Sequence, residues 1–420
     1  MLHVRRMPSG QSDPAFSADE IERVRSLHLA KKQRACLISL LLLLAPLASC
    51  RRRDFPQYPA DYREYAYVTS GGSNTVTVLD LVNLRQDRVI RVGDNPTGLA
   101  ANPVKNEIYA VNTNSSSVSV IDAQKNAVVA TIPVHSKPYF IDLDARGERG
   151  YVANSGSNNV SVIDLTRRRE IALIGAGEGP GMARISPDGK SLVVTNRTSG
   201  SVTVVDPQTY KVRSVFTGCP AATYAVILPD SSKAFVACSG GHQVMVVGLA
   251  RTDSPIAIEH ADRLLTFLDV GQTPVHLALK PDGGEIFVSN FDSDTISEIA
   301  TQANEVGGAY LVGAHPASAV VSADNSTLWI SKFNTGSIEV YSIDDGKTIN
   351  TVHVGDGPDA LAFSAEGHLL LVADARSNDV AVVRVMSRTP GGINRVGTLF
   401  TLLPAGKQPN DIVVKAFHVR

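Results

Sequence analysis

Histidines and a group of aspartates are the side chains of this 420-residue sequence that could do chemistry. His276 is the strongest single candidate, because an imidazole can act as a general acid or base, or bind a metal, near neutral pH. His135 and His315 stand in comparable loop contexts, but the three are far apart along the chain. Their spacing matches no zinc-binding motif, so we predict no metal site.

Acidic residues that could bind a cation or a basic ligand gather toward the end of the chain. The main ones are Asp356, Asp359, Asp374 and Asp411. Their spacing is unlike that of a calcium-binding loop. Two interpretations remain open at this point, a ligand surface and an ordinary solvated loop surface.

A repeat of about 42 residues must position all of these groups. Asp80, Asp122, Asp164 and Asp206 follow one another at intervals of 42 residues, and the same register continues to residue 384 with one interval of 52. A fixed period of this size is typical of solenoids and propellers. Each repeat contains four short segments rich in β-branched and aromatic residues, separated by turn formers, and shows no helical period. We therefore predict an all-β, single β-propeller of four-stranded antiparallel blades.

The number of repeats predicts eight blades. The second strand of each repeat begins with a large apolar residue, at Tyr67, Tyr109, Tyr151, Val193, Phe235, Phe287, Trp329 and Leu371. The chain opens on a second strand and ends on a first strand, from Asp411 to Ala416. The C-terminal strand should therefore complete the N-terminal blade and close the ring.

The phrases Tyr67-Val68-Thr69-Ser70, Tyr151-Val152-Ala153-Asn154 and Val194-Thr195-Asn196 resemble the YVTN-type β-propeller repeat. The resemblance extends over residues 65 to 419 and implies an exported or surface-bound propeller, with a looser similarity to propeller lactonases. Many relatives have seven blades, so seven is the alternative to the count of eight. Later copies depart from the motif, because Lys332 and Asp374 stand where other copies have Asn.

The first 64 residues lack the repeat and predict export. Basic residues at 31–34, an apolar run from Ala35 to Leu47 and the ending Leu47-Ala48-Ser49-Cys50 indicate a signal peptide over residues 1–49, with the true start near Val24. The ending resembles the bacterial lipobox, in which the Cys, here Cys50, is lipidated. We expect residues 50–64 to form a lipidated tether and residues 65–420 to form the propeller. Arg51, rather than Asp, after the lipidated Cys favours the outer over the inner membrane.

Residues that recur in every blade are predicted to serve folding. Asn112, Asn154, Asn196 and Asn290 end second strands, where Asn can adopt left-handed geometry and bond nearby backbone. Asp80 and its equivalents should bond the turn that follows the third strand. Asp142 and Arg184 occupy equivalent places on adjacent blades and are expected to pair across the interface.

Function is expected where the repeats differ. Loops that join second to third strands, and fourth strands to the next first strand, should lie together around one mouth of the channel. Two residues after each inner-strand Pro or its equivalent stand Gly98, Phe140, Met182, Tyr224, His276, Ser318, Ala360 and Asp411. Half of this ring is apolar and aromatic and half is small or polar, which would suit an amphipathic small ligand or a peptide end.

Cys219 and Cys238 should lie on the same face of one blade, so an exported protein could join them by a disulfide. A haem attachment is disfavoured because no Cys-x-x-Cys-His motif is present.

These observations favour a non-catalytic binding or scaffold lipoprotein without a cofactor, which contacts a protein, peptide or small ligand on the face distal to the membrane. A lactonase-like hydrolase or a redox-associated propeller that uses the channel is the alternative. The net charge of −1, with Lys and Arg spread over all repeats, predicts no nucleic-acid partner. We expect a monomer that meets the membrane only through its lipid anchor.

Overall fold

The computed structural model describes residues 56–419, apart from 252–253 and 389–393. The predicted signal peptide and Cys50 lie outside the described residues. Within the described part, no helix has both the length and the apolar character needed to cross a lipid bilayer. The compact unit that contains the sheets begins at Tyr58.

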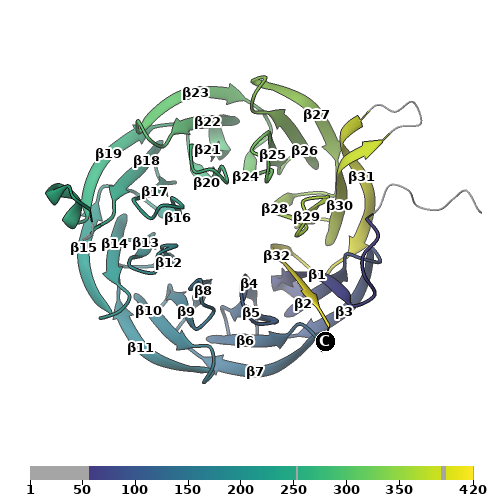
Figure 1. Cartoon of the computed structure of the whole chain (residues 1–420), viewed down its shortest axis with the longest axis horizontal. Coiled ribbons are helices and arrows are strands. Elements are labelled where there is room, and N and C mark those ends of the chain that lie inside the picture. The colour runs from purple at the N-terminus through teal and green to yellow at the C-terminus, as the bar shows by residue number, and fades with distance from the viewer. Residues whose placement is uncertain (1–55, 252–253, 389–393, 420) are drawn as a thin grey trace, which may run out of the picture. The chain divides into compact units, whose positions relative to one another are not determined.

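Eight four-stranded antiparallel sheets stand around a central channel (Figure 1). This confirms the predicted eight-bladed propeller, and the seven-bladed alternative is wrong. We number the blades by their first, innermost strand, so that blade 1 contains β32, β1, β2 and β3, blade 2 contains β4 to β7, and blade 8 contains β28 to β31.

Each blade contributes one strand to each of four concentric layers. The first strands are β32 (Pro409–His418), β4 (Pro96–Ala101), β8 (Pro138–Leu143), β12 (Pro180–Ile185), β16 (Ala222–Ile227), β20 (Pro274–Leu279), β24 (Pro316–Val321) and β28 (Pro358–Phe363). The second strands are β1 (Tyr62–Ser70), β5 (Glu107–Asn112), β9 (Arg149–Asn154), β13 (Leu192–Asn196), β17 (Lys233–Cys238), β21 (Glu285–Asn290), β25 (Thr327–Lys332) and β29 (Leu369–Asp374).

The third strands are β2 (Thr75–Asp80), β6 (Ser117–Asp122), β10 (Asn159–Asp164), β14 (Ser201–Asp206), β18 (Gln243–Gly248), β22 (Thr295–Ala300), β26 (Ser337–Ser342) and β30 (Asp379–Arg388). The fourth, outermost strands are β3 (Arg85–Arg91), β7 (Ala127–Pro133), β11 (Arg169–Gly175), β15 (Lys211–Thr217), β19 (Arg263–Asp269), β23 (Glu305–Leu311), β27 (Lys347–His353) and β31 (Asn394–Pro404). Three short 3-10 turns complete the described elements, η1 (Gly71–Ser73), η2 (Ala257–His260) and η3 (Phe291–Ser293).

The two ends of the repeat array meet in blade 1, as predicted. Strand β32 pairs antiparallel with β1, from Tyr62 opposite His418 to Ser70 opposite Pro409. Strand β1 begins at Tyr62, ahead of the predicted boundary at Tyr65, because this stretch is tied into the fold. The buried Glu64 carboxylate accepts hydrogen bonds from the Tyr62 hydroxyl at 3.2 Å and the Ala365 N–H at 2.6 Å.

The core lies between blades rather than inside any one of them. Second and third strands are buried on both faces, because each sheet packs against a neighbour on either side. The large side chains that recur in the second strands, such as Tyr67, Tyr109 and Trp329, are fully buried there. Outer strands instead alternate between half-buried and exposed positions, as expected of strands with one face in water.

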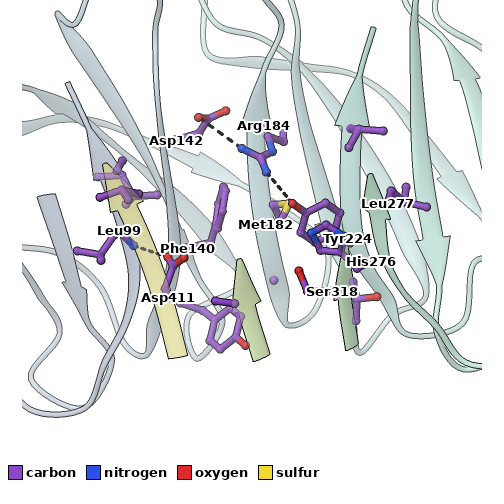
Figure 2. Close-up of a pocket in the computed structure, with 18 of the residues that line it drawn as sticks. Leu99, Phe140, Asp142, Met182, Arg184, Tyr224, His276, Leu277, Ser318 and Asp411 are labelled. Carbon is purple, nitrogen blue, oxygen red and sulfur yellow. Dashed lines mark hydrogen bonds and ion pairs between the residues drawn. The ribbon is translucent and has the colours of Figure 1, made fainter. Parts of the chain in front are cut away.

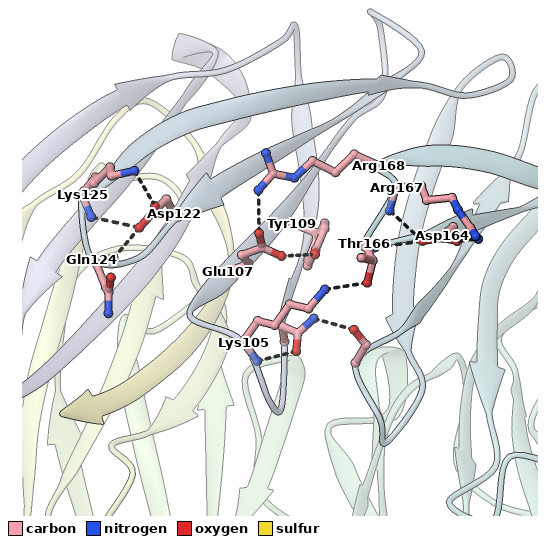
Figure 3. Close-up of polar contacts among 12 residues, drawn as sticks. Lys105, Glu107, Tyr109, Asp122, Gln124, Lys125, Asp164, Thr166, Arg167 and Arg168 are labelled. Carbon is pink, nitrogen blue, oxygen red and sulfur yellow. Dashed lines mark hydrogen bonds and ion pairs between the residues drawn. The ribbon is translucent and has the colours of Figure 1, made fainter. Parts of the chain in front are cut away.

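The recurring aspartates bond the turn after the third strand, which confirms their predicted role (Figure 3). Asp122 Oδ1 accepts the N–H groups of Gln124 at 2.9 Å and Lys125 at 3.1 Å. Asp164 does the same for Thr166 and Arg167, and the Arg167 N–H contributes most to lowering the pKa of Asp164.

Side chains also tie adjacent blades near these turns. Glu107 of blade 2 accepts the Tyr109 hydroxyl at 2.6 Å and pairs with Arg168 of blade 3 at 2.8 Å (Figure 3).

The recurring asparagines act differently from the prediction. Asn112, Asn154, Asn196 and Asn290 are strand residues without left-handed backbone, so that part of the expectation is wrong. Their side-chain amides instead donate hydrogen bonds to side chains on the third strand of the same blade. Asn112 Nδ2, for example, donates to Ser117 Oγ at 3.1 Å and to Ser119 Oγ at 3.0 Å. The structural role itself holds, but it is filled by hydrogen bonds between side chains.

Candidate binding site in the central channel

A cavity of about 1390 Å³ occupies the channel and is lined mainly by the first strands (Figure 2). One mouth is formed by the loops that join second to third strands and fourth strands to the next first strand. We call this side the top face. Most first strands begin there with Pro, which fits the first position of a strand because Pro cannot donate to the ladder.

The second residue after this Pro forms a ring of side chains just inside the top mouth. Register shifts after the Pro, for example between Pro180 and Met182 and between Pro274 and His276, turn these residues toward the channel. The predicted residues Phe140, Met182, Tyr224, His276 and Asp411 all line the cavity, and Asp359 lies one position earlier on β28.

This ring is two-sided. Blades 3 to 6 supply Phe140, Met182, Tyr224 and His276, and the rings of Tyr224 and His276 lie 4.3 Å apart between centroids. The remaining blades supply the small residues Gly98, Ser318 and Ala360, together with Asp411.

Three members of the ring share one structural task, which is to accept a backbone N–H from the next blade. Asp411 Oδ2 accepts Leu99 N–H at 2.8 Å, Met182 Sδ accepts Ala225 N–H at 3.5 Å, and His276 Nδ1 accepts Ala319 N–H at 3.4 Å. The inner strands are sheet edges, so these side chains satisfy donors that would otherwise be unpaired.

Arg184 lies one layer deeper, between the rings of Phe140 and Tyr224 (Figure 2). The guanidinium carbon is 4.8 Å from the Phe140 centroid and 5.8 Å from that of Tyr224. Its Nη1 is 3.8 Å from Asp142 Oδ1, which confirms the predicted pairing of these residues across adjacent blades. The guanidinium is held in an aromatic environment that strengthens its electrostatic interactions.

The electrostatics of the ring follow from its enclosure by protein. Burial raises the pKa of Asp411 to about 7 and that of Asp359 to about 6. Burial, helped by the charge of Arg184, lowers the pKa of His276 to about 3. His276 is therefore neutral at physiological pH. Because its Nδ1 faces an N–H donor, the ring proton belongs on Nε2, which then has no lone pair for a metal.

Two predicted ligand-face residues lie away from the channel lining. Asp356 is exposed in the loop before β28, and its Oδ1 lies 3.7 Å from Arg376 Nη1. Asp374 is fully buried at the end of β29, where it accepts Gly355 N–H at 3.1 Å, so it cannot contact a ligand from solution. Burial, followed by the charge of the adjacent Asp379, raises the pKa of Asp374 to about 8. Asp374 occupies the place of the recurring Asn, which explains its burial.

In blade 5 the position of the recurring Asn is occupied by Cys238. Cys238 forms a disulfide with Cys219, and their Cα atoms are 4.8 Å apart. In blade 2 the residue corresponding to Cys219 is Gly93, where an added Cβ would lie 2.7 Å from Asn112 Cγ. The two cysteines thus replace a Gly and Asn pair that is in close contact in other blades.

Sequence reasoning missed two features of the channel. Tyr139, 52% exposed, lines the top mouth beside Phe140, and Arg184 is a channel-lining cation as well as an interblade ion pair. The signal for Tyr139 was available, because its neighbour on the inner strand was already a candidate. No group of three or more His, Cys, Asp or Glu in residues 56–419, the two internal gaps aside, could hold a metal ion.

Solved structures similar to this chain share its fold at low sequence identity. Dihydro-heme d1 dehydrogenase NirN, in complex with DHE, has a TM-score of 0.67 and 14% identity over 86% of this chain and 76% of its own. Hydrazine synthase of Kuenenia stuttgartiensis has a TM-score of 0.52 and 20% identity over 76% of this chain and 91% of its own.

A Bacteroides fragilis protein provisionally assigned as a 6-phosphogluconolactonase has a TM-score of 0.54 and 15% identity over 86% of this chain and 100% of its own. At these identities the likeness shows the fold alone. No curated protein is significantly similar to the chain.

The family described as YNCE-like beta-propeller matches residues 148–389, which is more than half of the sequence. Together with the eight YVTN-type repeats and the closed ring, this match shows that the chain belongs to the YNCE-like β-propeller family.

Proposed function

We propose that this protein is a lipid-anchored propeller of the bacterial cell envelope that binds a ligand at the top mouth of its channel and does not transform it. The observation that carries the proposal is the two-sided ring, which has the large residues Phe140, Met182, Tyr224 and His276 on blades 3 to 6, and Gly98, Ser318, Ala360 and Asp411 on the other blades. A cavity whose wall combines an apolar and aromatic arc with polar and charged groups can hold and orient a ligand.

The polar groups of the ring support binding over catalysis because they are already engaged in the fold. Both oxygens of Asp411 accept backbone N–H groups, from Leu99 at 2.8 Å and Ile412 at 2.9 Å. His276 Nδ1 is likewise taken by Ala319 N–H. Each carboxylate oxygen keeps a second lone pair, but these hydrogen bonds hold both side chains against the backbone of the inner strands.

The proposed orientation follows from the direction of β1. This strand runs from Tyr62 toward the loop after Ser70, which belongs to the top face, so it begins on the opposite face. A tether anchored at Cys50 and joined to that end of β1 would direct the top face away from the membrane. The binding mouth would then meet molecules arriving from solution.

The alternative of a hydrolase or a redox propeller is supported by fold likeness to NirN and to the provisional lactonase. For a metal-bearing cofactor, the fit is poor at the one histidine of the described channel lining, because a metal on Nε2 would place the ring proton on Nδ1, which faces the Ala319 N–H donor at 3.4 Å. We therefore place this alternative second.

Site-specific photo-crosslinking in intact cells tests the proposal. A photoreactive residue at position 139 reports on the top mouth, and one at position 104, which is 67% exposed in the loop between β4 and β5, reports on the opposite face. Adducts of any mass would be identified by mass spectrometry. A defined adduct at 139 and none at 104 is expected. Adducts only at 104, or at neither position, would overturn the proposal.

A further inference from the structure

Arg184 has hydrogen-bonding capacity that the fold does not use. Its closest polar contacts are long, with Nε 3.4 Å from Ala225 O, Nη2 3.5 Å from Tyr224 Oη and Nη1 3.8 Å from Asp142 Oδ1. Arg213 is an example of a guanidinium with close partners, because it donates hydrogen bonds to both carboxylate oxygens of Asp262, at 3.0 and 2.8 Å. A guanidinium has five N–H donors in a planar fork, and that of Arg184 is poorly satisfied by comparison.

The environment of Arg184 favours an anion that approaches edge-on. The rings of Phe140 and Tyr224 lie against the guanidinium, while 28% of the Arg184 side chain stays accessible. The planar edge, where the N–H groups lie, matches the geometry of a carboxylate.

The ring nearer the mouth provides a place for the rest of such a ligand. Phe140, Met182, Tyr224 and His276 stand two residues closer to the top face than the Arg184 layer, a separation of roughly 7 Å along a strand. The opposite wall has the small residues Ser318 and Ala360, together with Asp411. The rings of Phe140 and Tyr224 offer a flat apolar group aromatic surface against which it can pack.

We infer that the channel binds a small molecule with a flat apolar body and one carboxylate, and that Arg184 is the residue that receives the carboxylate. This inference rests on the proposed function, because it places the ligand at the same mouth.

Charges that face the ligand predict how binding depends on pH. The titratable and charged groups of the lining are Lys137, Tyr139, Asp142, Asp144, Arg184, Arg197, Tyr224, His276, Asp359 and Asp411. Asp359 and Asp411, with pKa values raised by burial to about 6 and about 7, lose their negative charge as the pH falls. A carboxylate ligand, whose own pKa is about 4, should therefore bind more tightly at pH 5.5 than at pH 8.

Calorimetric titration of the full chain with 2-naphthoate and its uncharged counterpart 2-naphthamide tests the inference. We expect naphthoate to bind at least tenfold more tightly, since a hydrogen-bonded charge typically contributes this much. Arg184→Met should abolish the difference. Asp142→Asn, which releases Arg184 from its weak partner, should keep or increase it. Asp411→Asn still accepts Leu99 N–H and should reduce the pH dependence.

Controls separate a lost site from a lost fold. The double variant Arg184→Met with Asp142→Asn removes the carboxylate that the single change would strand, and its thermal unfolding should match the wild type within a few degrees. Equal affinity for the two probes, or unchanged naphthoate binding in a folded Arg184→Met protein, would refute the role of Arg184. Failure of both probes together with a crosslinked partner at position 139 would refute this inference while leaving the proposed function standing.

Discussion

Replacement of Asp374 by Asn should stabilise the protein at neutral and alkaline pH and leave it almost unchanged in acid. Asp374 is 0% exposed and lies opposite Asp379 across the hairpin of β29 and β30. Its pKa of about 8 in the fold lies far above the ordinary value for an aspartate, about 4, so the folded state holds a proton that the unfolded chain releases. Stability then falls as the pH rises from about 4 toward 8.

The size of the effect follows from the shift. A pKa difference of one unit between the folded and unfolded states corresponds to about 1.36 kcal/mol of stability. Between the unfolded pKa of about 4 and pH 7 lie about three units, so Asp374 destabilises the fold at pH 7 by at most about 4 kcal/mol. We expect about half of this bound, a gain of about 2 kcal/mol for Asp374→Asn at pH 7. An Asn here needs no proton and can donate to position 379, as Asn154 Nδ2 donates to Asn159 Oδ1 at 2.9 Å in blade 3.

Thermal and urea unfolding of both proteins between pH 4 and pH 9 measures this difference. A gain of about 2 kcal/mol corresponds to roughly 3 °C in Tm for a domain of this size. Asp379→Asn should recover part of the gain, whereas Asp269→Asn, at a side chain 76% exposed, should give none. A destabilised Asp374→Asn protein at pH 8, or a gain that does not vary with pH, would refute the reasoning.

Three further predictions concern the scaffold. The double variant Cys219→Ala with Cys238→Ala should lower the free energy of unfolding in urea by about 3 kcal/mol, because it opens the loop that the disulfide closes across a sequence separation of 19. The double variant Cys219→Gly with Cys238→Asn should recover part of this loss by restoring the Gly and Asn pair found in other blades. Equal stability of the two double variants would contradict the equivalence of the cysteines to that pair. Trp329→Ala should cost about 3 to 5 kcal/mol in the same assay, because this fully buried side chain leaves a cavity, and a loss under 1 kcal/mol would argue against its interblade packing. A chain that stops before Pro409 lacks β32 and should lose cooperative unfolding in calorimetry, and an unchanged transition would show that ring closure is dispensable.

The sequence predicted the scaffold well because its signals repeat. Aspartates at intervals of 42 residues and eight large apolar residues at the starts of the second strands predicted the blade count, and the phase difference between first and last strands predicted closure. Each repeated residue is constrained by the same local contacts in every blade, such as those of Asp122 and Asp164 with their turns.

Departures from the repeat were harder to interpret. Asp374 looked like a ligand-face acid because it precedes a loop, yet its place in the repeat is that of a buried Asn. The burial of that position depends on the neighbouring Gly355, which leaves room for the side chain and is distant in sequence from it. The aromatic contacts of Arg184 depend on residues from blades 3 and 5, on either side of its own, and no local pattern reports them.

The strands differ in how much of their surface is buried, and this difference explains why a binding site can form on the innermost layer. Second and third strands are buried on both faces, so their residues are restricted by packing in every blade. First strands meet the channel on one side, and the ring position tolerates Gly, Phe, Met, Tyr, His, Ser, Ala and Asp without a change in the strand pairing that follows. Variation there alters the channel wall and leaves the second and third strands unchanged, although Met182 also packs into a core cluster that Phe140 and Tyr224 contact. Phe140, Tyr224, His276 and Arg184 gather on blades 3 to 6, and the repeat does not require this grouping, because Gly98, Ser318 and Ala360 occupy equivalent ring positions in other blades. Ligand binding is a reason for the grouping that the naphthoate titration addresses directly.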